Sequence, residues 1–136
     1  MRIKLDEGAF TPTRAHPTDA GLDLYSREEQ VVPARGSAIF DTGLHIELPC
    51  ATVGMLKSKS GLNVKHGIIS EGVIDEGYTG SIVAKLYNLS DDDYWVYPGD
   101  KITQLVIMNY IAPKLEIVDE LDETDRGDNG FGSSGR

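Results

Sequence analysis

Residues 37–49 read SAIFDTGLHIELP, and the second half of this stretch shows the pattern that indicates the fold class. The apolar residues Leu44, Ile46 and Leu48 are separated by the polar residues His45 and Glu47. Alternation with a period of two is typical of a β-strand with one buried face, whereas a surface helix repeats its apolar residues every three or four positions. The stretch therefore predicts β-structure.

Similar short stretches, rich in β-branched and aromatic residues, recur along the chain between glycine, proline and aspartate. They are TVGMLKS (52–58), SIVAKLYN (81–88), YWVYPGD (94–100), KITQLVIMNYIA (101–112) and KLEIV (114–118). Short strands at this spacing, without a clear helical period, predict an all-β sandwich or barrel. A chain of 136 residues is expected to form one domain, residues 1–136.

The charge of the chain limits its partners. Its 13 basic and 22 acidic residues give a formal net charge of −9 at pH 7. The chain as a whole therefore repels nucleic acid and anionic membranes, and neither is expected as a partner. Any anionic ligand must be bound by local groups.

The cysteine count and the N-terminus predict a cellular setting. The single cysteine, Cys50, excludes an intrachain disulfide framework and a zinc site built from several thiolates. The first residues, MRIKLDEGAF, lack the apolar core of a signal peptide, and no segment approaches the roughly 20 apolar residues of a membrane span. We expect a cytoplasmic protein, or one of another intracellular compartment.

After Val118 the composition changes to DELDETDRGDNGFGSSGR, which is polar and rich in glycine. Such a segment cannot bury enough apolar surface to order itself alone, so residues 119–136 are predicted to form a mobile C-terminal arm. The arm nevertheless carries an aromatic residue, Phe131, among glycines and serines. A ligand that this ring could contact would explain it.

Four further segments carry candidate chemistry. In KSKSGLN (57–63), a serine and a glycine next to lysines could bind phosphate oxygens, although many surface loops share this composition. In EGVIDEGYTGS (71–81), Asp75 at a strand end could hold a water as a general base and Tyr78 could contact a sugar or a base, although an ordinary hairpin also fits. Asp23 in DAGLDLYS could merely accept backbone N–H bonds, and Gln104 in GDKITQLV could be a core amide.

Taken in order, these segments and the arm resemble the five motifs of the trimeric dUTPase family, the deoxyuridine triphosphate nucleotidohydrolases. The matching segments are DAGLDLYS (19–26), KSKSGLN (57–63), GVIDEGYTG (72–80), GDKITQLV (99–106) and RGDNGFGSSG (126–135). The resemblance implies a distorted jelly-roll β-sandwich that assembles as a homotrimer, in which neighbouring subunits share each active site. It also implies hydrolysis of dUTP to dUMP and pyrophosphate, with Mg2+ bound to the triphosphate.

The resemblance implies a role for each matching residue. Asp75 would activate the water that attacks the α-phosphorus, and Tyr78 would pack under the deoxyribose and exclude a 2′-hydroxyl. Asp23 would meet Mg2+ through water. The expected substrate contacts in the β-body are Lys59, Ser60 and Gly61 for phosphate, Gln104 for the α-phosphate or the water, and the backbone of Gly72, Val73 and Ile74 for uracil.

In the family the arm closes over the bound nucleotide. By position, Phe131 would stack on uracil, and the γ-phosphate would be bound by Arg126, Gly132, Ser133 and Ser134. Such an arm can become ordered when a ligand offers charged hydrogen-bonding groups and a stacking face.

The second motif departs from the common family pattern, because Ser58 and Lys59 stand where proline and arginine are usual. Lysine offers a point charge in place of a planar fork, which predicts looser orientation of the phosphate. Two alternatives remain open: a dCTP deaminase or bifunctional enzyme of the same fold, and a non-catalytic nucleotide-binding or regulatory module. The spacing of Asp75 and Tyr78, together with the Phe131 arm, favours the diphosphatase over the deaminase.

Overall fold

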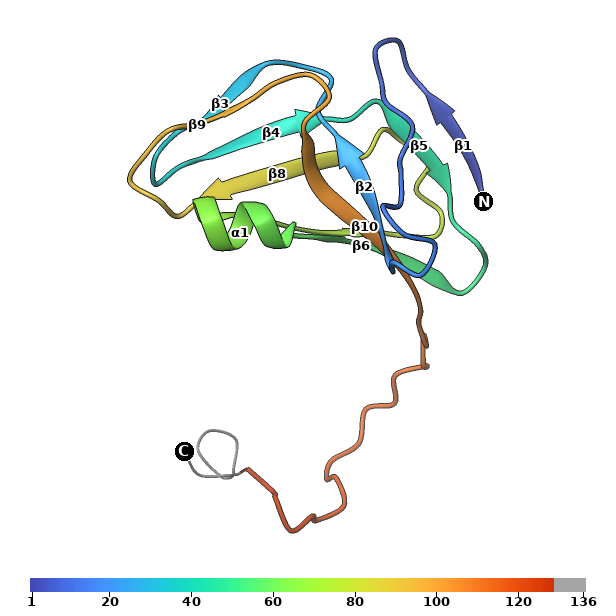
Figure 1. Cartoon of the computed structure of the whole chain (residues 1–136). Helices are drawn as coiled ribbons and strands as arrows, with labels where there is room; N and C mark the ends of the chain where they lie inside the picture. Colours follow the sequence, from blue (N-terminus) through green and yellow to red (C-terminus); the bar gives the residue numbers. More distant parts are fainter. Residues whose placement is uncertain (129–136) are drawn as a thin grey trace.

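The structure is a computed structural model, and it describes residues 1–128. Within them the chain forms β-strands and one short helix, which confirms the predicted all-β class (Figure 1). The elements are β1 (Arg2–Leu5), β2 (Gly21–Tyr25), β3 (Gln30–Val32), β4 (Ser37–Asp41), β5 (Leu44–Glu47), β6 (Thr52–Lys57), α1 (Ser60–His66), β7 (Ile68–Ile74), β8 (Val83–Asn88), β9 (Tyr94–Val96) and β10 (Lys101–Asn109).

Six strands form one antiparallel sheet in the order β2-β10-β6-β7-β8-β4. Two smaller antiparallel pairs, β1-β5 and β3-β9, complete the body. The long sheet curls on itself (Figure 1). The middle strand β6 pairs with both β10 and β7, whereas β7 pairs with β8 through residues 68–70 and with β6 through residues 71–74.

The hydrophobic core follows the alternation seen in the sequence. Leu44, Ile46 and Leu48 are all buried, as predicted. In β4, Ala38 and Phe40 are buried while Ile39 between them is 57% exposed. Other fully buried side chains of the core are Leu24, Val32, Leu56, Ile68, Ile82, Leu86, Val96, Ile102 and Leu105.

Local structure differs from the sequence analysis at two places. The segment 60–66, for which no helix was predicted, forms helix α1, which is capped by Gly67 with a left-handed φ of 66° that glycine adopts without steric cost. The segment 114–118, whose residues suggest a strand, is not one, because a strand needs a hydrogen-bonding partner and no strand lies beside it in the described part of the chain.

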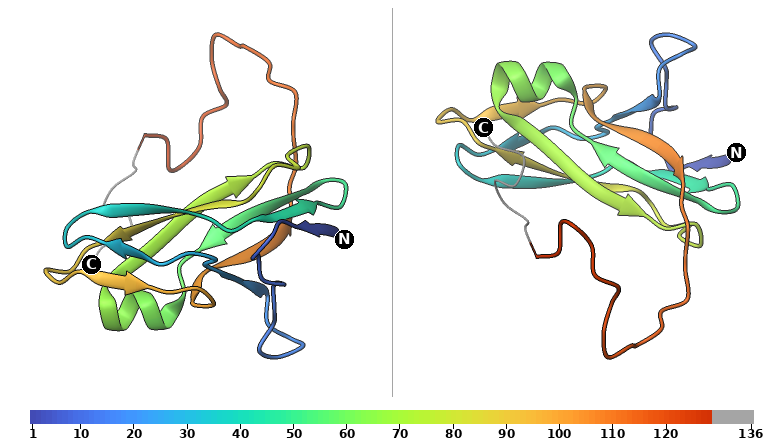
Figure 2. Two further views of the ribbon diagram at one scale, coloured as in Figure 1. Left: turned by 90° about the horizontal axis from the view of Figure 1, so that it is seen from above. Right: turned by 90° about the horizontal axis from the view of Figure 1, so that it is seen from below.

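The segment after β10 leaves the sheets and runs outward in both views of Figure 2. Every residue from Ile111 to Asp128 is exposed, including Leu115 and Ile117, which are 94% and 100% exposed. The segment thus adds nothing to the core. Across residues 1–128, no helix is both long and apolar enough to cross a membrane.

Candidate active site

A pocket of about 430 Å³ brings together residues from three of the predicted segments. Asp23 on β2, Lys59 just before α1, and Gln104 on β10 all line it. The register explains this meeting, because Gln104 lies opposite Asp23 on one side and opposite Lys57 on the other. Strand pairing therefore gathers side chains that are as many as 81 positions apart in the sequence.

The carboxylate of Asp23 lies between two lysines. Lys59 bonds one carboxylate oxygen, and the Nζ of Lys101 lies 2.8 Å from the other. Burial raises the pKa of Asp23, but the hydrogen bonds from Lys101 and Lys59 outweigh it and lower the pKa overall. The pocket is lined by two lysines, Lys57 and Lys59, and two carboxylates, Asp19 and Asp23. Lys101, which does not line the pocket, adds a further cation against Asp23.

Gln104 is held in one orientation by its neighbours. Its Nε2 donates to the carbonyl of Ser58 at 3.0 Å, and its Oε1 lies over Gly21 on β2. A Cβ on Gly21 would approach Oε1 to 2.2 Å, so the glycine provides the space that the amide needs. Gln104 is half-buried and faces the pocket, which corrects the alternative of a plain core amide.

Ser58 and Lys59, the two departures from the family pattern, both make defined contacts. The Oγ of Ser58 accepts a hydrogen bond from the N–H of Ser70 at 2.9 Å and donates to the carbonyl of Ser70 at 3.1 Å. This links the start of α1 to β7.

The helix begins at Ser60, and the N–H groups of a first helical turn have no acceptor within the helix. Ser60 and Gly61 are exposed.

Asp75 and Tyr78 lie in the turn after β7, away from this pocket. Asp75 is exposed and follows the buried Ile74. The N–H of Tyr78 donates to the carbonyl of Asp75 at 3.0 Å, and its hydroxyl donates to the carbonyl of Ser81 at 2.9 Å. The ring lies across Gly80, where a Cβ would come within 2.6 Å of Cζ. The ring of Tyr78 is therefore fixed, with 44% of the residue exposed.

A second pocket, of about 360 Å³, opens beside Asp75 and is lined by Val53, Asp75, Glu76, Gly77 and Tyr110. The carboxylate of Glu76 accepts hydrogen bonds from the N–H of Ala51 at 2.9 Å and from the hydroxyl of Tyr110 at 3.3 Å. The charge of Glu76, together with this hydrogen bond, raises the pKa of Tyr110. These contacts hold the first half of the turn against β6 and β10.

The strand register places Asp75 far from the pocket that contains Gln104. Ile74 lies opposite Gly54, so Asp75 is level with Val53, while Gln104 lies opposite Lys57. Four residues of strand correspond to roughly 13 Å. One water molecule can join groups no more than about 6 Å apart, so Asp75 and Gln104 of the same chain cannot share an attacking water.

Gly72, Val73 and Ile74 are the residues whose backbone is predicted to contact uracil. They pair with β6 on one side only. On the other side, β8 pairs with β7 only up to Ser70. The side chain of Ile74 is buried, so only backbone groups of this residue could contact a ligand. The edge of β7 from residue 71 to 74 thus has no strand partner within residues 1–128.

The arm residues complete the comparison with the sequence predictions. Arg126 is exposed and lies on the extended segment, whereas Phe131, Gly132, Ser133 and Ser134 lie outside the described residues. The sequence reading missed Lys101, whose position directly after a predicted turn and two residues beyond Gly99 was the available signal. It also missed Gly21, because the need for a residue without a side chain beside Gln104 leaves no pattern in the sequence.

Among residues 1–128, no group of three or more histidine, cysteine, aspartate or glutamate side chains could hold a metal ion. Both oxygens of Asp23 are engaged by lysines. The described residues therefore do not form a self-contained magnesium site. They fit Mg2+ only if most of its ligands come from elsewhere.

Comparison with known proteins agrees with this picture. The dUTPase family model matches residues 8–135. The deoxyuridine 5'-triphosphate nucleotidohydrolase of Arabidopsis thaliana is 47% identical over 133 residues, which cover 97% of this chain and 80% of that protein.

Two solved phage enzymes share the architecture. The dUTPase of Staphylococcus bacteriophage 80alpha with dUpNHpp superposes with a TM-score of 0.88 at 32% identity, covering 99% of this chain and 98% of that one. A dUTPase from phage phi11 of S. aureus, described with a structural Mg(II) ion, has a TM-score of 0.81 at 29% identity and covers 88% of this chain and 96% of that one. With its family model matched over nearly its whole length, the chain belongs to the dUTPase family.

Proposed function

We propose that this protein is a dUTP diphosphatase that hydrolyses dUTP to dUMP and pyrophosphate. The observation that carries the proposal is the pair of complementary half-sites. One half-site is a pocket with Lys59 and Gln104, and the other is a turn with an exposed carboxylate and a fixed tyrosine ring. Together they supply what hydrolysis of a nucleoside triphosphate needs: phosphate binding, a general base and a sugar contact.

The triphosphate is bound at the pocket that contains Lys59 and Gln104. Lys59 supplies charge, and Ser60 and Gly61 supply exposed first-turn N–H groups and a hydroxyl. Because Asp23 already holds Lys59 and Lys101, the lysines are positioned before the substrate arrives. Pre-positioned charges stabilise a developing negative charge without reorganising.

Mg2+, when bound, neutralises part of the triphosphate charge. Its ligands would be mainly triphosphate oxygens, since the described residues offer only Asp23 and its carboxylate is engaged by lysines. Asp23 would then contact Mg2+ through a water. We expect little turnover after chelation of the metal.

Asp75 is the general base. Its carboxylate takes a proton from a water, the water oxygen attacks the α-phosphorus, and the bond from this phosphorus to the oxygen bridging it to the β-phosphorus breaks. The electron pair of that bond leaves with pyrophosphate. The exposed position of Asp75, directly after the buried Ile74, supports this role because an anchored backbone limits where the carboxylate can lie.

Tyr78 packs under the deoxyribose, and the backbone of Gly72, Val73 and Ile74 contacts the uracil. The fixed ring of Tyr78 would leave no space for a 2′-hydroxyl. The unpaired edge of β7 offers N–H and C=O groups to a base edge, as an exposed strand edge does for any partner.

The active site is shared between subunits of a homotrimer. Within one chain the general base and Gln104 are roughly 13 Å apart along the strands, so each half-site must be completed by a neighbour. The arm, residues 119–136, would close over the nucleotide, with Arg126, Gly132, Ser133 and Ser134 on the γ-phosphate and Phe131 on the uracil. An intracellular location also remains a prediction.

The test is an assay of the purified full chain with Mg2+ and, separately, dUTP, dCTP, dTTP and UTP, in which pyrophosphate, phosphate and ammonia are measured. We expect pyrophosphate from dUTP and little from the other three nucleotides. Ammonia from dCTP would replace the proposal with the deaminase. Binding of dUTP without any product would replace it with a nucleotide-binding module.

A further inference from the structure

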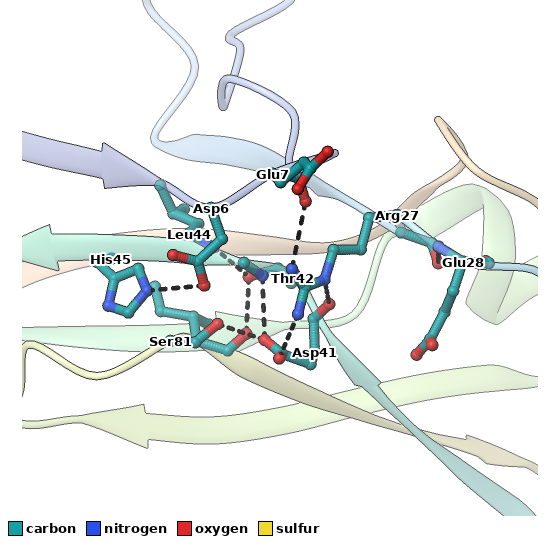
Figure 3. Close-up of polar contacts among 12 residues, drawn as sticks. Asp6, Glu7, Arg27, Glu28, Asp41, Thr42, Leu44, His45 and Ser81 are labelled. Carbon is teal, nitrogen blue, oxygen red and sulfur yellow. Dashed lines mark hydrogen bonds and ion pairs between the residues drawn. The ribbon is translucent and has the colours of Figure 1, made fainter.

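A polar network outside the proposed half-sites joins β4 to the turn that carries Tyr78 (Figure 3). Its centre is Asp41, the last residue of β4. The carboxylate of Asp41 accepts hydrogen bonds from Arg27 Nη2 at 2.6 Å, from the N–H of Gly43 at 3.0 Å and from the hydroxyl of Ser81. Of these residues only Ser81 belongs to the segment that contains Asp75 and Tyr78.

Ser81 is the residue on which the ring of Tyr78 depends. The hydroxyl of Tyr78 donates to the carbonyl of Ser81 at 2.9 Å, and the ring lies on the peptide of Gly80 directly before it. The main chain at Ser81 therefore determines where the far end of the ring lies. A shift of this carbonyl would carry the ring with it.

Ser81 itself is held on two sides. Its hydroxyl is bonded to Asp41, and the next residue, Ile82, is fully buried. The N–H of Ile82 donates to the carbonyl of Leu44 at 2.8 Å, and its carbonyl accepts bonds from the N–H of Thr42 at 3.0 Å and from Thr42 Oγ1 at 2.7 Å. These bonds anchor the segment at Ile82 and leave the Asp41 contact to set the orientation of Ser81.

The network has the features of a positioning device. Arg27 and Asp41 have side chains that are 27% and 45% exposed, and partly exposed ion pairs contribute little to stability. The pKa of Asp41 is lowered, first by the hydrogen bond from Ser81 and then by those from Gly43 and Arg27, so the carboxylate stays ionised and accepting near neutral pH. The main effect of these contacts is therefore to hold the main chain at Ser81 in position.

We infer that Ser81 and Asp41 are positioning residues for Tyr78 and thereby set the discrimination between deoxyribose and ribose. The inference rests on the proposed function, because it assigns to Tyr78 the sugar contact. Neither residue is needed for the chemical step. Loss of either contact would let the ring move and admit a 2′-hydroxyl that the fixed ring excludes.

The experiment compares S81A and D41A with the unmodified protein. The ratio of kcat/KM for dUTP to kcat/KM for UTP is measured, with the inhibition constant of UTP as a second measure of ribose binding. We expect this ratio to fall about tenfold in both variants, since a small misplacement of a contact residue has effects of this order or larger. S81T keeps the hydroxyl and should restore the ratio. D91N, which removes an exposed partner of Arg35, is the matched control and should leave it unchanged.

The outcomes are distinguishable. If the unmodified protein does not hydrolyse dUTP, the proposed function itself fails. If it does, and both variants keep the ratio within about twofold, the positioning role is wrong. An equal loss of kcat/KM for both nucleotides, together with a lower melting temperature, would likewise overturn it, because that pattern reports a structural role only.

Discussion

At the level of single residues, the turn after β7 holds its functional side chains by contacts that the sequence does not display. Asp75 is exposed, but its carbonyl accepts the N–H of Tyr78, and the neighbouring Glu76 is bonded to Ala51 and Tyr110. The turn is therefore fixed on both sides of the carboxylate. A general base gains from such a fixed position, because its distance to the attacked phosphorus then varies little.

Replacing Asp75 by asparagine tests the proposed base. The amide cannot take a proton from water, so we expect turnover of dUTP to fall by about 10²-fold or more. Binding of a non-hydrolysable dUTP analogue should change little, since size and shape are kept. Both are measured on the full chain, with D92N at another exposed turn as the control. Near-normal turnover in D75N would remove Asp75 from the mechanism.

His45 gives a prediction about pH. Its Nδ1 is 2.8 Å from the carbonyl of Thr79. Its Nε2 is 3.1 Å from a carboxylate oxygen of Asp6 (Figure 3). Both partners are acceptors, so only the doubly protonated ring donates to both. The hydrogen bond to Thr79, followed by that to Asp6, raises the pKa of His45 above its usual 6.5, although burial and, to a smaller extent, the charge of Lys4 oppose this.

Because the folded state holds the proton more tightly, this contribution to stability is full below the unfolded pKa and is lost as pH rises through the raised pKa. The free energy of unfolding should therefore decline more between about pH 6 and pH 8 in the unmodified protein than in H45Q. Urea unfolding at several pH values measures it. The histidines His16 and His66 are present in both proteins and cancel in the comparison. Parallel pH profiles would contradict the prediction.

At the level of elements, the contact between β2 and β10 shows how strand pairing forms the pocket around Gln104. Gln104 reaches over Gly21 toward Ser58, and the glycine is the reason that its amide fits. An alternating strand pattern predicts which face of β10 is buried but not which side chain of β2 it meets. That depends on register, which long-range pairing determines.

Replacing Gly21 by alanine should displace the side-chain amide of Gln104 without unfolding the protein. The new Cβ would lie 2.2 Å from Gln104 Oε1, so the flexible end of Gln104 must move. We expect turnover to fall about tenfold or more while the melting temperature changes by only a few degrees. The double variant G21A/Q104A should be no worse than Q104A, because both remove the same interaction. Additive losses would show that Gly21 acts by another route.

At the level of the whole molecule, the separation of Asp75 from Gln104 supports the proposal that neighbouring subunits share each active site. Two inactive variants test this. D75N retains the phosphate half-site, and Q104A retains the base. If they are denatured and refolded together in equal amounts, one site in four pairs an intact base with an intact pocket, so mixed trimers should regain about a quarter of the wild-type activity. Each variant refolded alone is the control. No recovery in mixtures whose light scattering shows trimers would place both half-sites within one subunit.

Candidate residues for this site could be named from the sequence because its motifs are local. Asp75 with Tyr78, and Lys59 with Ser60 and Gly61, are close in the chain, and short segments with special turn residues keep their chemistry wherever the fold places them. Helix α1 was not predicted because its seven residues are too few to show a period. The strand expected at 114–118 was wrong, because strand propensity has no effect without a neighbouring strand.

By itself, the sequence determined the all-β class, the buried faces of the strands and the residue types able to bind a nucleotide. It could do so because alternation and turn chemistry are properties of neighbouring residues. Only the tertiary structure decided that Asp23, Lys59 and Gln104 meet in one pocket while Asp75 and Tyr78 lie elsewhere. The physical reason is register, since pairing between distant strands sets which side chains are level with one another, and no local pattern records it.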